Sequence, residues 1–150
     1  MATQLQLRKG TRIQNDAFTG AEGELTYNST DRGLRLHDGS TQGGAEVPVL
    51  VYVQRPTAEN GYTWARKYSD RWVEQGGRVT SGGGGIIVNL PVTMADVYYT
   101  ITYAQGGTDN DYDSGADTIK TDTLTTTSFQ LNRYASGATS YWEVKGYAAE

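Results

Sequence analysis

Short stretches in which apolar and polar residues alternate constrain this chain more than any other feature of its sequence. A repeat of two residues fits a β-strand, whose successive side chains point to opposite faces, and does not fit a helix. In residues 1–44 the alternating apolar pairs are Leu5 and Leu7, Leu25 and Tyr27, and Leu34 and Leu36. Asn, Asp, Ser and Gly follow the second and third pairs, which is turn chemistry. We therefore predict three short strands here and no amphipathic helix in the chain.

The same pattern continues through the rest of the chain. Further strands are predicted at residues 62–68, 72–75, 86–92, 97–103, 128–131 and 141–147. In the first hairpin, Trp72 should lie near Tyr68 or Trp64, and cross-strand aromatic pairs contribute roughly 0.2–1 kcal/mol each. Short strands separated by polar loops are typical of a β-sandwich or barrel. The predicted fold class is all-β, with an antiparallel, sandwich-like C-terminal domain.

The N-terminal strands have too few apolar side chains to form a core from one chain. These residues are mainly Leu5, Leu7, Ile13, Phe18, Leu25, Tyr27, Leu34 and Leu36. A piece of about 40 residues is seldom stable without disulfides, metals or partner chains. Cysteine is absent, so oligomerisation is the favoured remedy. We predict a trimerisation module at residues 1–46, a connector at 47–60 and a β domain at 61–150.

Charge and hydropathy argue against several kinds of partner. The formal net charge is −4 and the pI is near 5.0. The chain therefore lacks the basic field that neutralises phosphates, and nucleic acid is not an expected partner. No apolar run is long enough to cross a bilayer, and residues 1–4 lead into no secretory signal. We expect neither membrane insertion nor conventional secretion.

No metal ligand, cofactor or catalytic centre is expected. His37 is the only histidine, and its place before Asp38 and Gly39 indicates a plain turn. Residues 109–117 approach a calcium-loop pattern, but glycine comes one place late and Lys120 occupies the position of the closing glutamate. A solvated acidic loop is the preferred interpretation. Because no nucleophile elbow or convincing carboxylate pair is present, we predict that the chain is not an enzyme.

Three segments, in order, resemble a known family. Residues 7–11 (LRKGT), 17–25 (AFTGAEGEL) and 34–44 (LRLHDGSTQGG) resemble the N-terminal domain of phage major tropism determinants, a module that recurs in many tail fibres. The resemblance covers nearly all of residues 1–44. It implies an intertwined trimeric β-prism, in which three chains supply the core that one chain lacks.

The second part of the chain resembles a C-terminal domain common at the ends of tail fibres. Residues 64–77 (WARKYSDRWVEQGG) look like its opening hairpin, and residues 141–147 (YWEVKGY) are similar to the way such domains finish. The family usually has glycine at the position of Arg71, so a left-handed conformation there would cost on the order of 1 kcal/mol. The resemblance implies a receptor-binding tip.

Surface glycans are the ligand class that such a tip would meet. An aromatic face packs against sugar C–H groups while amides and carboxylates bond the hydroxyls, and loops on a rigid sheet commonly carry binding function. The candidate receptor contacts are Tyr103, Asp109, Asn110, Tyr112, Asp113, Asn132, Arg133 and Tyr134. Trp64, Tyr68 and Trp72 are interpreted as hairpin packing instead.

Together these features predict a homotrimeric phage tail-fibre receptor-binding protein, located in the virion at the tail fibre or tail tip. Its partners would be other tail or baseplate proteins and a bacterial lipopolysaccharide, capsule or surface protein. Two alternatives stay open. One is a purely structural virion or baseplate accessory protein without receptor binding. The other is a polysaccharide depolymerase, which usually needs a much longer chain.

Overall fold

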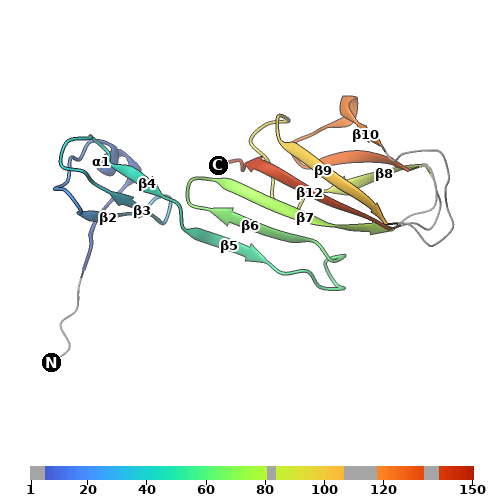
Figure 1. Cartoon of the computed structure of the whole chain (residues 1–150), viewed down its shortest axis with the longest axis horizontal. Helices are drawn as coiled ribbons and strands as arrows, with labels where there is room; N and C mark the ends of the chain where they lie inside the picture. The colour runs from blue at the N-terminus through green and yellow to red at the C-terminus, as the bar shows by residue number, and fades with distance from the viewer. Residues whose placement is uncertain (1–5, 81–83, 107–117, 134–138) are drawn as a thin grey trace. The chain divides into compact units, whose positions relative to one another are not determined.

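The computed structural model describes residues 6–80, 84–106, 118–133 and 139–150. Two compact units are present: residues 1–51 with 68–70, and residues 52–67 with 71–150. Strands make up nearly all of the regular structure (Figure 1), and the described residues add one short α-helix and one 3-10 turn. The prediction of an all-β fold is confirmed.

The first unit holds a four-stranded sheet in the order β1-β2-β3-β4. Its strands are β1 (Arg8–Gly10), β2 (Leu25–Asn28), β3 (Gly33–Leu36) and β4 (Ala45–Val47). β1 is parallel to β2, whereas β2, β3 and β4 are antiparallel neighbours. The strands predicted around residues 25–27 and 34–36 are present, but the N-terminal strand lies at Arg8–Gly10 and does not include Leu7.

One element of this unit, α1 (Arg12–Asp16), is not indicated by the apolar pattern. A helix of about one turn is too short to show a helical repeat of apolar residues. Thr11 begins it, because the Thr11 hydroxyl accepts a hydrogen bond from the Gln14 backbone N–H and Gln14 Oε1 accepts one from the Thr11 N–H. This reciprocal capping box holds the helix start in place.

The sheet of the first unit has one open apolar face. The register pairs Leu25 with Leu36 and Tyr27 with Leu34, and it pairs Leu34 with Val47, so these five side chains share a face. Leu25, Leu36 and Val47 are 39%, 45% and 37% exposed. We call these five residues the apolar face of the first unit.

Polar side chains fill the opposite face. The Thr26 hydroxyl donates to Asn15 Oδ1 at 2.8 Å and lies 3.0 Å from His37 Nε2. The Gly20 backbone N–H donates to His37 Nδ1, and Arg35, which is 6% exposed, forms ion pairs with two carboxylates. The prediction that His37 is a plain turn residue is wrong, because the ring is buried with both nitrogens in this network. In a single chain, the first unit therefore buries a polar network and leaves Leu25 and Leu36 exposed to solvent.

Two sheets build the second unit (Figure 1). The larger has the order β5-β6-β7-β12-β9, with strands β5 (Leu50–Gln54), β6 (Trp64–Tyr68), β7 (Trp72–Thr80), β12 (Thr139–Tyr147) and β9 (Thr100–Gly106). The smaller has the order β10-β11-β8, with strands β10 (Thr118–Lys120), β11 (Ser128–Arg133) and β8 (Gly84–Asn89). The turn η1 (Thr121–Thr123) follows β10. The pairings β6-β7, β7-β12, β12-β9, β10-β11 and β11-β8 are antiparallel.

The inner faces of the two sheets share one apolar core. Its buried members are Val73, Val88, Met94, Tyr99, Phe129, Leu131, Trp142, Val144 and Ala148. Phe129 of the smaller sheet meets Trp142 of the larger edge-to-face, with ring centroids 5.7 Å apart. A Cβ at Gly77 would lie 3.1 Å from the Trp142 ring, so the bare glycine lets the indole lie across β7. Unlike the first unit, this unit encloses its own apolar side chains.

The hairpin β6-β7 turns through a strained residue. Arg71 has φ of 72°, a left-handed conformation in which its Cβ approaches the following carbonyl. The Arg71 carbonyl accepts a hydrogen bond from the Ala148 N–H, which ties the turn to the end of the chain. Arg71 therefore adopts the left-handed conformation that the glycine usual at this position suggested.

Trp72 finds its aromatic partner outside this hairpin. Its ring meets that of Tyr147 edge-to-face, with centroids 5.4 Å apart, and the two residues are directly opposite in the β7-β12 register. Trp64 lies opposite Gly76 instead. Of the two neighbours predicted for Trp72, the register that pairs Lys67 with Val73 brings Tyr68 beside it and keeps Trp64 away.

Candidate functional site

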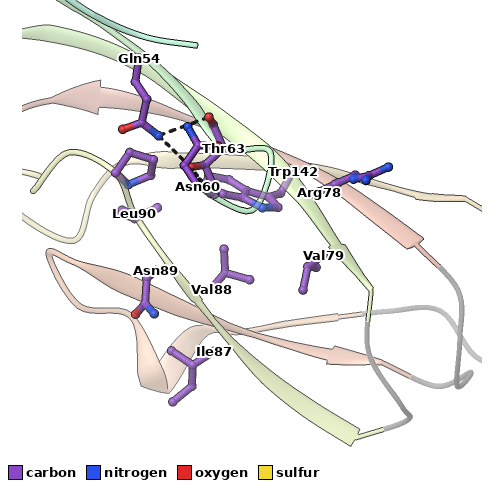
Figure 2. A pocket seen from close by; sticks show the side chains of 11 residues that line it. Gln54, Asn60, Thr63, Arg78, Val79, Ile87, Val88, Asn89, Leu90 and Trp142 are labelled. Atoms are coloured by element: carbon purple, nitrogen blue, oxygen red, sulfur yellow. Dashed lines mark hydrogen bonds between the residues drawn. The ribbon is translucent and has the colours of Figure 1, made fainter. Parts of the chain in front are cut away.

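A pocket with a volume of about 430 Å³ lies on the second unit beside β8. The larger sheet has five strands and the smaller has three, so the smaller sheet leaves part of the larger one uncovered. The pocket opens where β8 forms the edge of the smaller sheet. Figure 2 shows its lining residues, which are Gln54, Asn60, Thr63, Arg78, Val79, Ile87, Val88, Asn89, Leu90, Pro91 and Trp142.

The floor of this pocket is apolar and firmly packed. Trp142 is 4% exposed and Val88 is 5% exposed, and the Val88 side chain points toward the Trp142 ring (Figure 2). At this exposure the Trp142 ring belongs to the packed core and forms only the base of the pocket.

Carboxamide side chains stand at the rim, and two of them are held by hydrogen bonds of their own. Gln54 Nε2 donates to the carbonyl and the hydroxyl of Thr63 at 3.2 and 2.8 Å. Asn60 Oδ1 accepts a hydrogen bond from the Thr57 N–H at 2.9 Å. Because these contacts fix both side chains before any ligand arrives, the rim is preorganised.

Arg78 is the one charged residue among those that line the described pocket. Its guanidinium carbon lies 3.8 Å from the centroid of the Tyr62 ring, which is a cation–π stack. Tyr62 has φ of 60°, an uncommon conformation for a bulky residue, and its N–H donates to the Thr57 carbonyl at 2.7 Å. Backbone strain of this kind gathers at functional sites.

The receptor contacts predicted from the sequence are not lining residues of this pocket. Tyr103, 36% exposed, lies on β9 opposite Trp142, so β12 separates it from β7. Asn132 lies on β11 and accepts a hydrogen bond from Gln130 Nε2 at 3.1 Å. Arg133 ends β11, and its side chain falls outside the described part. The other predicted residues also fall outside the described ranges: Asp109, Asn110, Tyr112, Asp113 and Tyr134.

Sequence reasoning did not identify Arg78 and Trp142 as lining residues of one pocket. Trp142 of β12 lies opposite Gly77 of β7, a pairing over a long separation in the sequence. The usable signal was the pair Gly76 and Gly77 inside a strand, because glycine there often marks a place where another group approaches closely.

Other chemistry is sparse in the described residues. They contain no group of three His, Cys, Asp or Glu side chains placed to hold a metal ion, and no helix among them has the length and apolar character to cross a membrane. The segment 109–117, considered above as a calcium loop, lies outside the described ranges.

The shifted pKa values belong to residues away from the pocket. Hydrogen bonds from the Thr41 side chain, and then from the Thr41 and Ser40 N–H groups, hold the pKa of Asp38 well below its ordinary value. A hydrogen bond from Arg12 lowers the pKa of Asp31. Burial raises the pKa of the Tyr99 phenol.

The N-terminal segment of the chain matches a known protein family. Residues 5–41 match the family described as the major tropism determinant N-terminal domain. Over 113 residues, 73% of this chain, the sequence is 28% identical to the tail fiber receptor-binding protein of Bordetella phage BPP-1. The chain spans 28% of the length of that relative.

A solved structure resembles the fold. The C-terminal part of the R2 pyocin fiber of P. aeruginosa matches 69% of this chain with a TM-score of 0.51 and 16% sequence identity, and 27% of that fiber chain is covered. At this identity the likeness concerns the fold alone. The resemblance to phage tail-fibre proteins, inferred above from short segments, is confirmed.

Proposed function

We propose that this chain is a receptor-binding protein of a phage tail fibre and that it acts in the virion tail. The observation that carries this proposal is the apolar face of the first unit. It lies largely within the segment that matches a fibre module, and its leucines stay open in the described chain. A sheet with a polar interior and an open apolar face needs partner chains to bury that face.

The proposed partners in the first unit are two further copies of the same chain. Leu25 opposite Leu36 and Leu34 opposite Val47 form one continuous apolar patch, and such patches mark interaction surfaces. Three copies around a threefold axis would pack each patch against the other two. This arrangement is the trimeric β-prism that the family resemblance implies, over the proposed module at residues 1–46.

The second unit is proposed to meet the bacterial surface, through lipopolysaccharide, capsule or a surface protein. The candidate residues between Tyr103 and Tyr134 that the sequence analysis names remain proposed contacts. The pocket beside β8 adds a site on the described part of the same unit. Three weak sites on a trimer can raise avidity by roughly 10² or more without any new contact, so weak affinity per site is sufficient.

We propose no catalytic step. Hydrolysis of a glycoside needs two carboxylates across a cleft, and the described residues that line the pocket contain none. The alternative function is a structural accessory of the tail or baseplate that uses the same modules for assembly. That alternative predicts a stable oligomer that does not attach to host cells.

Light scattering coupled to size exclusion tests the assembly. We expect a mass near three times the 16.3 kDa chain that persists on dilution. A stable monomer would contradict the trimer and remove the main support for a fibre module.

Attachment is tested by sedimenting fluorescently labelled protein with intact bacteria from strains that differ in surface polysaccharide. We expect retention by some strains and loss after the polysaccharide is stripped or, for a protein receptor, after protease treatment. An oligomer retained by no strain would favour the structural alternative.

A further inference from the structure

The larger sheet of the second unit has one face on the core and one face turned away from it. Val73 of β7 and Val144 of β12 are buried in the core, and successive side chains of a strand point to opposite faces. Arg78 and Tyr141, which are paired across these strands, therefore point away from the core. We call this side of the sheet the outer face. Arg78 borders the pocket beside β8, but its guanidinium lies on the outer face, on the other side of the sheet from Trp142.

Three aromatic rings gather around Arg78 on the outer face. Tyr141 lies directly opposite it, and the guanidinium carbon of Arg78 lies 3.8 Å from the centroid of the Tyr62 ring. Trp64 lies opposite Gly76, which precedes Arg78 on the same face of β7 by about 7 Å. A Cβ at Gly76 would lie 2.8 Å from the Trp64 ring, so the indole rests over the bare glycine. We call Tyr62, Trp64, Arg78 and Tyr141 the outer platform.

The composition of the outer face indicates what could cover it. Tyr141 is 54% exposed and Tyr62 is 43% exposed. Among the outward-pointing residues of β6, β7, β12 and β9 that the structure describes, none is leucine, isoleucine, valine, methionine or phenylalanine. Contacts between copies of one chain have an apolar centre from which charged residues are depleted, whereas this face carries arginine, lysine and glutamate. Aromatic rings with polar ends suit a ligand that has both C–H faces and hydroxyl groups, so a saccharide fits better than a second copy.

Arg78 supplies the only charge of the outer platform. It takes part in none of the ion pairs that join described residues, and the neighbouring carboxylate of Glu143 pairs with Lys145 at 3.4 Å. The Tyr62 ring supports one flat side of the guanidinium and leaves its edge of N–H donors open. A carboxylate or a phosphate pairs with such an edge through two parallel hydrogen bonds. The platform therefore complements an anionic ligand.

We propose that the outer platform binds an acidic saccharide, with Trp64 and Tyr141 packing on its rings and the Arg78 edge pairing with its carboxylate or phosphate. This inference rests on the proposed receptor-binding function and narrows it to an anionic surface glycan. Sugar acids and sugar phosphates present the same chemistry to Arg78. The outer platform is separate from the pocket beside β8, because the sheet lies between the Arg78 guanidinium and the pocket base at Trp142.

Sugars that differ only at carbon 6 test this proposal. Glucose, glucuronate and glucose 6-phosphate, and the corresponding forms of galactose, are titrated at constant ionic strength into the ¹⁵N-labelled full chain in its native assembly. The indole N–H signals of the three tryptophans are recorded by NMR and assigned with the variants Trp64→Phe and Trp72→Phe. Trp64 is the reporter, and Trp142 is the internal control because it is buried on the opposite face.

We expect at least one acidic sugar to shift the Trp64 signal with an apparent Kd about tenfold or more below that of its neutral parent, while Trp142 does not move. Acetate and inorganic phosphate, which have no ring, should bind more weakly than that sugar. A response to the uronates alone assigns a carboxylate, and a response to the sugar phosphates alone assigns a phosphate. Equal binding of the neutral parents or of the ring-free anions, or no shift with any acidic sugar, overturns the proposal.

Variants identify the residues. Arg78→Gln should weaken the acidic sugar about tenfold or more and leave the neutral sugar unchanged, whereas Arg78→Lys should fall between, because it keeps the charge and loses the planar edge. Tyr141→Ala should weaken the acidic and the neutral sugar by the same factor, because it removes a ring contact and no charge. Lys120→Gln is the matched control, since it removes a positive charge from β10 of the smaller sheet. Wild-type affinity in Arg78→Gln would contradict the assignment.

Light scattering on the same variants tests the competing occupant, a second copy of the chain. We expect Arg78→Gln and Tyr141→Ala to keep the wild-type mass. A lower mass for either variant, together with a Trp64 signal that no sugar moves, would show that the outer face is a contact between copies and would overturn the proposal.

Cell attachment distinguishes failure of the site from failure of the proposed function. If wild-type protein and Arg78→Gln attach equally and the Trp64 signal does not respond, the outer platform is not the receptor site and the receptor-binding function stands. If an acidic sugar binds at Trp64 but wild-type protein attaches to no strain, the site stands and the attachment function fails.

Discussion

Replacing Leu36 by glutamate should dissociate the proposed trimer while the second unit stays folded. Leu36 is 45% exposed on the apolar face and lies opposite Leu25, which is 39% exposed. A carboxylate at this position would be solvated in a monomer and would lose its water among apolar side chains in an assembly. The substitution therefore acts mainly on association and not on the strand that carries it.

The size of the effect follows from the exposed area. Full burial of a leucine side chain contributes roughly 1.5–3 kcal/mol. Covering the 45% of Leu36 that one chain leaves open then contributes roughly 1 kcal/mol per chain. The substitution removes three such contributions from one trimer, roughly 3 kcal/mol, which lowers the association constant about a hundredfold. Desolvation of the carboxylates adds to this loss.

Light scattering over a dilution series measures this effect. The matched control is Gln42→Glu, which adds the same charge at an exposed turn of the same unit. We expect Gln42→Glu to keep the wild-type mass and Leu36→Glu to fall toward the 16.3 kDa chain, with near-ultraviolet circular dichroism from the Trp142 core retained. A Leu36→Glu protein that holds the wild-type mass at every concentration would refute the assignment of this face to the interface.

Arg71→Gly should raise the free energy of unfolding by roughly 0.5–1 kcal/mol over Arg71→Ala, because both variants lose the side chain and only glycine relieves the φ of 72°; urea denaturation checks this. Gly76→Ala should destabilise the second unit by roughly 1–3 kcal/mol, since its Cβ would lie 2.6 Å from the Trp142 carbonyl oxygen; equal urea midpoints would contradict it. The pKa values of Asp31 and Asp38 are lowered on folding from 3.8, so their stabilisation is present above that pH and lost as pH falls below it. Thermal midpoints should therefore drop on acidification, and less so in Asp38→Asn.

Periodicity predicted where strands lie but not which face is buried. β2 and β3 follow the alternation of Leu25 to Tyr27 and Leu34 to Leu36. Such alternation is compatible with burial of either the apolar or the polar face of the sheet. The structure buries Thr26 and Arg35 instead, because α1 and the segment after β3 provide their hydrogen-bond partners. These partners are distant in the sequence, so no local pattern could have revealed them.

The same distinction explains what was found at single residues. The capping pattern of Thr11 and Gln14 and the left-handed turn at Arg71 depend on neighbouring residues, and both can be read from short segments. His37 is buried through contacts to Gly20 and Thr26, which a reading of its immediate neighbours assigned to a turn. The candidate pocket belongs to this second class, because its lining residues come from segments that are far apart in the sequence.

The two units differ in whether one chain buries their apolar side chains. Phe129, Leu131 and Val144 are at most 1% exposed in the second unit, so its core forms within one chain. In the first unit, hydrogen bonds that contribute only about 1 kcal/mol each fill the interior while Leu25 and Leu36 stay exposed. In the proposed trimer, the stability of this unit would depend on chain concentration. The trimer would then tie folding of the first unit to the number of second units in one assembly, and substitutions in the second unit would change binding without disturbing the assembly that makes weak binding effective.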